Sequence, residues 1–275
     1  MGSIDELWRY DGRRVVVTGC ASGIGAHLVR QLSELGAQVV GLDTRRPAAQ
    51  VTEFHEVDLA DPASIDQAVA EMGGRVDALF NVAGVSSGIG DPLLVVTINF
   101  LGLRHLTEAL VATMSAGSSI ACVSSLSAAE YREHLQEVGG LLSTLTMEEG
   151  IDWCQQHPQS LADGGYRLSK EAVILYCMKN AGPLGAKGIR INCTGPGVTA
   201  TPILDQLRAA YGEAFLDDIP KPLGRVSEPA EQAAVLVFLN SPAASYITGE
   251  VIWVDGGNVA SRVAESLKER EPWRA

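Results

Sequence analysis

The sequence predicts an α/β protein: one domain on a doubly wound parallel sheet, with helices on both faces and a helical insert. Three observations predict it. Strand-like and helix-like segments alternate to about residue 125, the order of repeated βαβ units. The strand-like segments include apolar runs without alternation, as in strands buried on both faces. A glycine-rich turn joins the first strand to the first helix.

The first half of the chain supplies five strands. Residues 13–18 contain three consecutive valines, and residues 26–35 carry apolar residues at helical spacing up to Gly36, which can end a helix. The other elements of this half are expected as strands at 38–42, 53–57, 76–82 and 119–123 and as helices at 62–72 and about 93–114. Several of these strands end in polar residues, at the edge where parallel sheets bind ligands.

The second half completes the sheet. The expected elements are a helix at 164–181, a strand at 188–194, a helix at 228–239 and a strand at 250–254. Pro183 is expected to end the first of these helices early. Residues 126–163 are predicted to form the insert, with helices at 131–138 and 141–154, and residues 259–275 a C-terminal tail. The chain, 1–275, is therefore interpreted as a single domain.

Composition restricts the class of partner. A net charge of −12 argues against a nucleic-acid or anionic-membrane partner. The N-terminus lacks a basic region followed by an apolar stretch, so no signal peptide is expected, and no apolar run reaches the ~18 residues of a membrane helix. The five scattered cysteines indicate reduced thiols and a cytoplasmic protein. No metal site is expected, because cysteines and histidines do not cluster at ligand spacing.

The glycine-rich turn predicts a dinucleotide site. Residues 18–25 read Thr-Gly-Cys-Ala-Ser-Gly-Ile-Gly, between a predicted strand and a predicted helix. A backbone without Cβ atoms there lets a pyrophosphate approach the N–H groups of the helix N-terminus. The spacing is G-x-x-x-G-x-G and not the commoner G-x-G-x-x-G. The cofactor-binding residues predicted in this turn are Gly19, Ser22, Gly23, Ile24 and Gly25.

Asp43 ends the second strand, 18 residues after Gly25. A carboxylate here can accept hydrogen bonds from the ribose hydroxyls of the adenosine half and repels a 2′-phosphate. Arg45 and Arg46 follow and could bind such a phosphate if they turned inward, although charges in a solvated loop are the commoner case. The sequence therefore favours NAD over NADP.

Tyr166 and Lys170 stand four residues apart, which places them on one helix face. The ordinary pKa of a tyrosine, ~10, is too high for a base at neutral pH. A neighbouring ammonium and a positive nicotinamide favour the phenolate. Tyr166 can then take the proton of an alcohol as hydride leaves carbon, and return it in the reverse direction.

Together these residues resemble the short-chain dehydrogenase/reductase family, over about residues 12–258. The motifs that carry the resemblance are Thr18-Gly19-x-x-x-Gly23-x-Gly25, Asp58-Leu59, Asn81-x-Ala83-Gly84, Asn99, Ser125, Tyr166-x-x-x-Lys170 and Pro196-Gly197-x-x-x-Thr201. Each motif alone is weak, but the ordered set is specific. The resemblance implies a Rossmann-type fold and an oxidoreductase acting on CH–OH groups.

The resemblance also implies roles for these residues. Ser125 would hydrogen-bond the substrate oxygen, Lys170 would hold the nicotinamide ribose, and Asn99 would fix a water that links Lys170 to solvent. Asp58 and Leu59 would bracket the adenine. The remaining cofactor contacts implied are Asn81, Ala83, Gly84, Pro196, Gly197, Val198 and Thr201, together with Tyr166 and Lys170.

The substrate is less well defined. Ser125 and Tyr166 are 41 residues apart, a much longer spacer than most of the family has. Two subgroups that share a long spacer are the bacterial 3α-hydroxysteroid dehydrogenase/carbonyl reductases, resembled by residues 241–246 with 255–257, and the coniferyl alcohol dehydrogenases, resembled by residues 99–109. The resemblance implies that residues 199–222 form a lid over the substrate. The apolar residues of this segment are Ile203, Leu204, Leu207, Tyr211, Phe215, Leu216 and Ile219. They favour a hydrophobic alcohol or carbonyl, although an amphipathic helix packed on the sheet explains several of them equally well.

Two other functions are weighed against this one. A nucleotide-sugar epimerase or dehydratase uses the same Tyr and Lys, but such chains usually carry a larger C-terminal substrate domain. A non-catalytic NAD(H)-binding redox sensor would be favoured by loss of the Ser, Tyr or Lys, and all three are present. A homo-oligomer is expected, as a dimer more than as the tetramer common in the family, because the insert adjoins the helices that usually pair.

Overall fold

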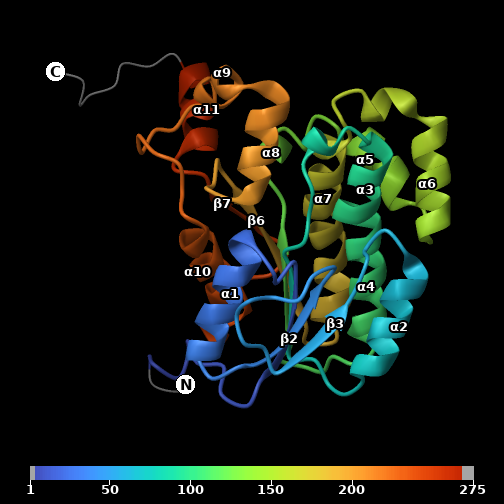
Figure 1. The fold of residues 1–275 in the computed structure, drawn as a ribbon, viewed down its shortest axis with the longest axis vertical. Coiled ribbons are helices and arrows are strands. Elements are labelled where there is room, and N and C mark those ends of the chain that lie inside the picture. The colour runs from blue at the N-terminus through green and yellow to red at the C-terminus, as the bar shows by residue number, and fades with distance from the viewer. Residues whose placement is uncertain (1–3, 268–275) are drawn as a thin grey trace.

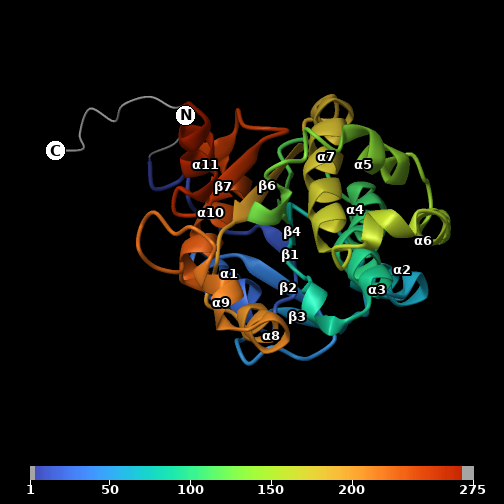
Figure 2. The ribbon, with the colours of Figure 1, turned by 90° about the horizontal axis from the view of Figure 1, so that it is seen from above.

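The fold is a single α/β unit in which seven parallel strands form one sheet in the order β3-β2-β1-β4-β5-β6-β7. The protein is represented by a computed structural model, which describes residues 4–267 apart from the side chains of Phe215 and Ser266. The strands are β1 (Arg14–Thr18), β2 (Gln38–Asp43), β3 (Glu53–Glu56), β4 (Ala78–Asn81), β5 (Ser119–Val123), β6 (Arg190–Pro196) and β7 (Val251–Val254). Figures 1 and 2 show helices on both sides of the sheet, as predicted.

The helices are α1 (Gly23–Glu34), α2 (Pro62–Met72), α3 (Pro92–Val96), α4 (Leu103–Val111), α5 (Leu135–Leu142), α6 (Met147–Gln156), α7 (Tyr166–Gly185), α8 (Pro202–Tyr211), α9 (Glu213–Asp217), α10 (Pro229–Asn240) and α11 (Asn258–Leu267). Helices α1 and α10 pack together on one face of the sheet, and α2, α4 and α7 cover the other. The predicted C-terminal tail therefore begins as α11, and residues 268–275 lie outside the described residues.

The ligand-binding edge of the sheet is centred on the carboxyl ends of β1 and β4. These strands pair in parallel although the chain visits β2 and β3 between them, so the strand order reverses there. The hydroxyl of Thr18, at the end of β1, accepts hydrogen bonds from the N–H groups of Val82 and Ala83 at 2.9 and 3.0 Å. A doubly wound sheet binds its ligand at such a reversal, beyond the carboxyl ends of the strands.

The long helix expected at 93–114 runs from Pro92 to Val111 and contains a π-helical stretch at 97–102. It crosses the loop after β3 closely: a Cβ on Gly102 would lie far inside contact distance of the Leu59 carbonyl oxygen. The helix is long and apolar enough to cross a membrane, but 67% of its 18-residue apolar window is buried within the protein. Its apolar residues therefore serve the core.

The expectation that Pro183 ends its helix early is wrong. Helix α7 continues through Pro183 to Gly185. A proline this close to the helix end removes one backbone hydrogen bond from the last turns, while the buried side chain of Leu184 and the packing of α7 on β6 hold the segment in place.

The insert contains the two helices expected there, α5 and α6, shifted by several residues from their predicted bounds. Helix α5 packs on α7, and α6 packs on the π-helical stretch. The buried guanidinium of Arg104 donates to the carbonyls of Thr144 and Thr146 at 2.7 and 2.8 Å. The insert is therefore fastened to the α4–α7 pair, at the right of Figure 1.

Candidate active site

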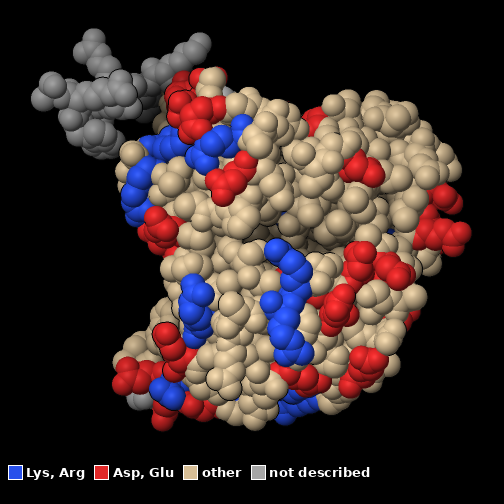
Figure 3. Space-filling model, viewed as in Figure 1, with Lys and Arg blue, Asp and Glu red and all other residues tan. Residues whose placement is uncertain are grey.

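A cavity of about 470 Å³ lies at the carboxyl edge of the sheet. Figure 3 shows the surface hollowed there, across the middle of the face below α8. The predicted site residues that line it are Gly19, Ser22, Gly23, Ile24, Gly25, Asp43, Leu59, Ala83, Gly84, Ser125, Tyr166, Lys170, Pro196, Gly197, Val198 and Thr201. Residues at or just beyond the ends of six strands thus converge on one cavity.

Three predicted site residues do not line this cavity. Asn99 is fully buried, and its amide group accepts from the N–H of Val85 at 2.8 Å and donates to the carbonyl of Val85 at 2.9 Å. Asn81 is buried under the sheet edge and donates to Thr107 at 2.9 Å. Asp58 is exposed, and its carboxylate caps the N–H of Ala60 at 2.8 Å. In this structure Asn99 and Asp58 bond to the backbone of nearby loops, whereas Asn81 bonds to helix α4.

The glycine-rich turn has the geometry that a pyrophosphate needs. Gly19 has φ +68°, and a Cβ there would come within 2.8 Å of the Ala83 Cα. A Cβ on Gly25 would collide with the carbonyl oxygen of Gly19. Ser22 lines the cavity and caps α1 without a side-chain hydrogen bond, so the first N–H groups of that helix have no side-chain partner there. These features fit the diphosphate of a dinucleotide.

Substitution of Gly25 by alanine tests this cradle. The added methyl group forces the Gly19 backbone to move, so we expect NADH binding at least ~10-fold weaker and unfolding free energy reduced by about 1–3 kcal/mol. Fluorescence titration of NADH and thermal unfolding measure the two effects. The matched control is Gly182→Ala: the Gly182 Cβ position on α7 is open, so stability should rise by about 0.5–1 kcal/mol. NADH binding unchanged in Gly25→Ala would contradict the assignment.

Asp43 lies where the adenosine ribose is expected. Its carboxylate lines the cavity and accepts hydrogen bonds from the N–H groups of Ala21 at 3.0 Å and Arg45 at 3.1 Å. Arg45 lines the cavity as well, whereas the guanidinium of Arg46 lies 4.9 Å from the centre of the Phe54 ring. The two arginines left open by the sequence therefore differ: Arg45 faces the site and Arg46 packs on β3.

Tyr166, Lys170 and Ser125 meet at the inner end of the cavity. Burial raises the pKa of Tyr166, and a hydrogen bond with the Ser125 side chain opposes that rise. The Lys170 ammonium lies 5.7 Å from the centre of the Tyr166 ring and donates to the Val123 carbonyl at 3.0 Å. Lys170 is only 4% exposed, and its burial lowers its pKa from 10.5 to about 8. Ser125 is thus the partner that favours the phenolate here.

Two hydrogen-bonded contacts hold the backbone of the Tyr166–Lys170 turn. The Ser169 hydroxyl donates to the Tyr166 carbonyl at 2.7 Å and receives the Asn99 amide at 3.2 Å. The Ser124 hydroxyl, at the end of β5, donates to the Lys170 carbonyl at 2.7 Å. The turn that carries Tyr166 and Lys170 is therefore tied to the sheet and to the π-helical stretch.

The outer wall of the cavity is largely apolar. Of the apolar residues expected in the lid, five line the cavity: Ile203, Leu204, Leu207, Leu216 and Ile219. Tyr211 does not line it, and the Phe215 side chain lies outside the description. The lining residues that sequence reasoning missed include Val85, Ser87, Leu126, Ser127 and Gln206. Leu126 and Ser127 directly follow Ser125 and could have been found by adjacency, whereas only the fold brings α8 beside residues 85–87.

Fold and site define a nicotinamide-dependent oxidoreductase, and comparison with known proteins agrees. Residues 157–258 match the enoyl-(acyl carrier protein) reductase family model, and residues 15–140 match that of the NAD dependent epimerase/dehydratase family. Coniferyl-alcohol dehydrogenase of Pseudomonas sp. (strain HR199 / DSM 7063) is 36% identical over 91% of this chain and 98% of its own. The chain belongs to the short-chain dehydrogenase/reductase family.

Two other relatives extend the comparison. The 3-alpha-hydroxysteroid dehydrogenase/carbonyl reductase of Comamonas testosteroni is 32% identical over 88% of this chain and 95% of its own. The crystal structure of the 3-alpha-hydroxysteroid dehydrogenase of Pseudomonas sp. B-0831, complexed with NADH, is similar with a TM-score of 0.77 and 32% identity, covering 94% of this chain and all of that one. The predicted fold, the family and the class of enzyme are therefore confirmed.

Proposed function

We propose that this protein is an NAD-dependent oxidoreductase that interconverts a hydrophobic secondary alcohol and its carbonyl. The observation that carries the proposal is the meeting of Ser125, Tyr166 and Lys170 at one end of a cavity whose other wall is the apolar lid. When bound, the nicotinamide accepts or supplies the hydride. The glycine-rich turn holds the dinucleotide at its diphosphate.

The chain's own residues manage the proton and the substrate oxygen. Ser125 donates a hydrogen bond to that oxygen and orients it toward Tyr166. In oxidation the Tyr166 phenolate takes the alcohol proton, and in reduction the phenol gives it back. With the dinucleotide bound, Lys170 would turn from the Val123 carbonyl to the ribose hydroxyls, and its charge would then add to the Ser125 hydrogen bond in favouring the phenolate.

For the substrate, a 3α-hydroxysteroid or similar alicyclic alcohol is the first candidate, supported by the fold match to a hydroxysteroid dehydrogenase and by the apolar lid. A coniferyl-type aryl alcohol is the second, supported by the 36% identity to such an enzyme. Steady-state kinetics with both classes, ranked by kcat/KM, decide between them. No turnover with any alcohol or carbonyl in either class would contradict the proposed function and favour a non-catalytic NAD(H)-binding redox sensor.

Cofactor preference should depend on Asp43. In Asp43→Ala, we expect NAD(H) binding to weaken by about tenfold or more, because charged hydrogen bonds are lost, while NADP(H) binding weakens less or improves. Fluorescence titration with NADH and NADPH measures both. Asp43→Asn keeps the size of the side chain and one hydrogen-bond acceptor but removes the charge. It therefore measures the repulsion of the 2′-phosphate separately from the loss of hydrogen bonds. The control is Arg46→Ala, which should leave the preference unchanged. A wild type that binds NADPH more tightly than NADH would sink this assignment.

We further propose a homodimer that does not use the α4–α7 surface. The insert packs against that helix pair, which the family usually uses for its four-helix contact. Strand β7 is the C-terminal edge of the sheet, and the fully exposed ring of Tyr246 lies in the segment between α10 and β7. A closed two-fold dimer through this edge is the simplest assembly.

Light scattering tests the assembly. The wild type should have the mass of a dimer, and Tyr246→Glu should shift it toward the monomer by placing a charge in the interface. Leu145→Glu, at an exposed position of the insert, is the control and should remain a dimer. A wild-type tetramer that pairs α4 and α7 would end this proposal.

We propose a cytoplasmic location because the cysteines are free thiols. All five are buried free thiols, as expected in a reducing compartment. Cell fractionation with a tagged full-length chain is the direct measurement, and recovery from an oxidising compartment would contradict it.

A further inference from the structure

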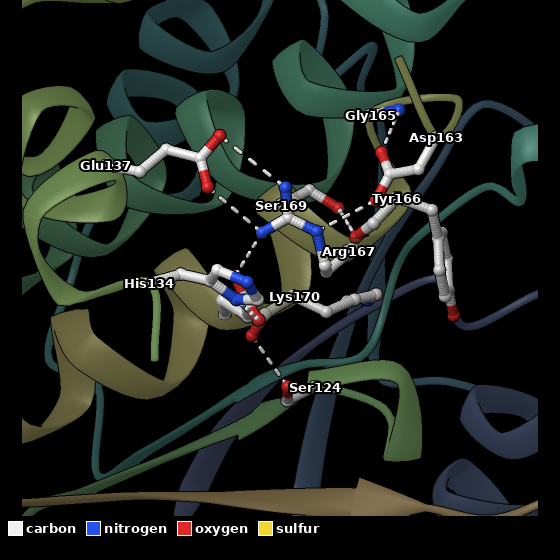
Figure 4. Close-up of polar contacts among 10 residues, drawn as sticks. Ser124, His134, Glu137, Asp163, Gly165, Tyr166, Arg167, Ser169 and Lys170 are labelled. Carbon is white, nitrogen blue, oxygen red and sulfur yellow. Dashed lines mark hydrogen bonds and ion pairs between the residues drawn. The ribbon is translucent and has the colours of Figure 1, made fainter. Parts of the chain in front are cut away.

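The first two turns of α7 carry two side-chain pairs on different faces. Tyr166 and Lys170 face the cavity. Arg167 and Glu171 each follow one of them directly and so lie about 100° further around the helix. Figure 4 shows the Tyr166 ring and the Arg167 guanidinium pointing to different sides of the helix. Any rotation or slide of these turns therefore displaces both pairs together.

The Arg167 guanidinium bridges three carboxylates. It lies 2.7 Å from Glu171 on its own helix, 3.1 Å from Glu137 on α5 and 3.0 Å from Asp163 in the chain just before α7. Asp163 also accepts the N–H of Gly165 at 3.1 Å. One side chain thus fastens the start of the catalytic helix to the insert and to the segment that leads into it (Figure 4).

Glu171 is a carboxylate with no exposed side-chain surface. One oxygen pairs with Nδ1 of His134 at 2.7 Å, and the other with Arg167 at 2.7 Å. Burial raises the pKa of Glu171, and both partners oppose that rise. Since a buried carboxylate is tolerated only while its partners remain in place, Glu171 holds the helix and the insert in one relative position.

The start of α7 needs such support. Tyr166 is the first residue of the helix, and its N-cap, Gly165, has φ 72° and makes no side-chain cap hydrogen bond. The first turn of a helix has free N–H groups and frays most easily. A base placed there keeps its position only if other contacts fix the turn.

We propose that Arg167 and Glu171 are positioning residues that keep the Tyr166 phenol against Ser125, with the insert as their anchor. Neither side chain lines the cavity, so both act through the position of the helix. This inference rests on the proposed role of Tyr166 as proton donor and acceptor. It assigns the insert a part in setting the proton affinity of that phenol.

The test is the pH midpoint of tyrosinate formation at Tyr166, taken as the ultraviolet difference between each variant and the same variant carrying Tyr166→Phe. In Glu171→Gln, loss of a negative charge would by itself lower this midpoint. Loss of the Ser125 hydrogen bond through misplacement raises it instead. The two effects have opposite signs, so the direction identifies the cause. Arg167→Lys keeps the charge and loses the planar guanidinium that binds several carboxylates. The expected rise of the midpoint in this variant therefore has no charge component.

We expect the midpoint to rise in both variants, kcat to fall roughly 10- to 100-fold, and NADH affinity to stay within about twofold. An unchanged or lowered midpoint in folded Arg167→Lys overturns the proposal, even if its melting temperature falls, and so does a lowered midpoint in folded Glu171→Gln. If Glu171→Gln does not fold, Glu137→Gln takes its place, because Glu137 lies at a partly exposed position of the insert. Its midpoint is judged in the same way.

Arg132→Lys is the matched control. Arg132 is an exposed arginine of the same insert, whose guanidinium lies 4.7 Å from the centre of the Tyr131 ring. In Arg132→Lys, the Tyr166 midpoint and kcat should equal those of the wild type. A wild type without turnover on any alcohol or carbonyl would refute the proposed function. The tyrosinate midpoints would still decide whether Arg167 and Glu171 position the phenol.

Discussion

Replacing Tyr166 by phenylalanine should reduce kcat by about 10²–10⁴-fold while NADH binding stays within about threefold. The variant keeps the half-buried ring and its packing and removes only the hydroxyl that gives and takes the proton. The Ser125 hydroxyl loses its partner and can still hydrogen-bond the substrate oxygen. Turnover in both directions with the best substrate of the panel, and fluorescence titration of NADH, measure the two quantities.

The control for Tyr166→Phe is Tyr131→Phe, in the insert, whose buried hydroxyl has no hydrogen-bond partner among the described residues. Its kcat should match that of the wild type. Retention of more than about a tenth of wild-type kcat by Tyr166→Phe lies outside the range for loss of a general acid–base and would move the proton transfer to another residue.

Replacing Lys170 by methionine should abolish turnover and yet stabilise the protein. Burial lowers the pKa of Lys170 from 10.5 to about 8, which corresponds to a cost of about 3 kcal/mol for keeping the ammonium inside the folded state at neutral pH. Methionine has a similar shape and no charge. Loss of the hydrogen bond to the Val123 carbonyl offsets about 1 kcal/mol of the stabilisation gained by removing the charge. The net gain in unfolding free energy at pH 7 should therefore be about 1–3 kcal/mol.

The pH dependence of this gain separates it from a packing effect. Below pH 8 both folded and unfolded wild type carry the proton, so the folded state bears the full cost. Between pH 8 and 10.5 the unfolded chain binds more protons than the folded one, and wild-type stability rises with pH. The advantage of Lys170→Met should therefore be largest below pH 8 and disappear by about pH 10.5. Denaturant unfolding across this range measures it, and an advantage independent of pH would contradict the burial cost of the ammonium.

Much of the geometry of the candidate site could be predicted from the chain alone because it is local. Tyr166 and Lys170 share a helix face by spacing, and the glycine-rich turn follows from a strand, a turn and a helix in succession. Apolar runs and their alternation with helices determined the parallel sheet and the order of its elements. These features involve residues close in sequence, so propensity and periodicity describe them.

What only the tertiary structure decided depends on contacts between distant segments. Pro183 continues a helix that local chemistry would end, because Leu184 is held in the core. Asn81 and Asn99 do not line the cavity, and their amide groups bond to Thr107 and to the Val85 backbone instead. Burial lowers the pKa of Lys170, and an ion pair with Glu137 joins Arg167 to the insert. Both arise only when segments far apart in sequence come together in the interior. Burial sets the energies of charges and hydrogen bonds, and no local pattern records which residues a fold will bury together.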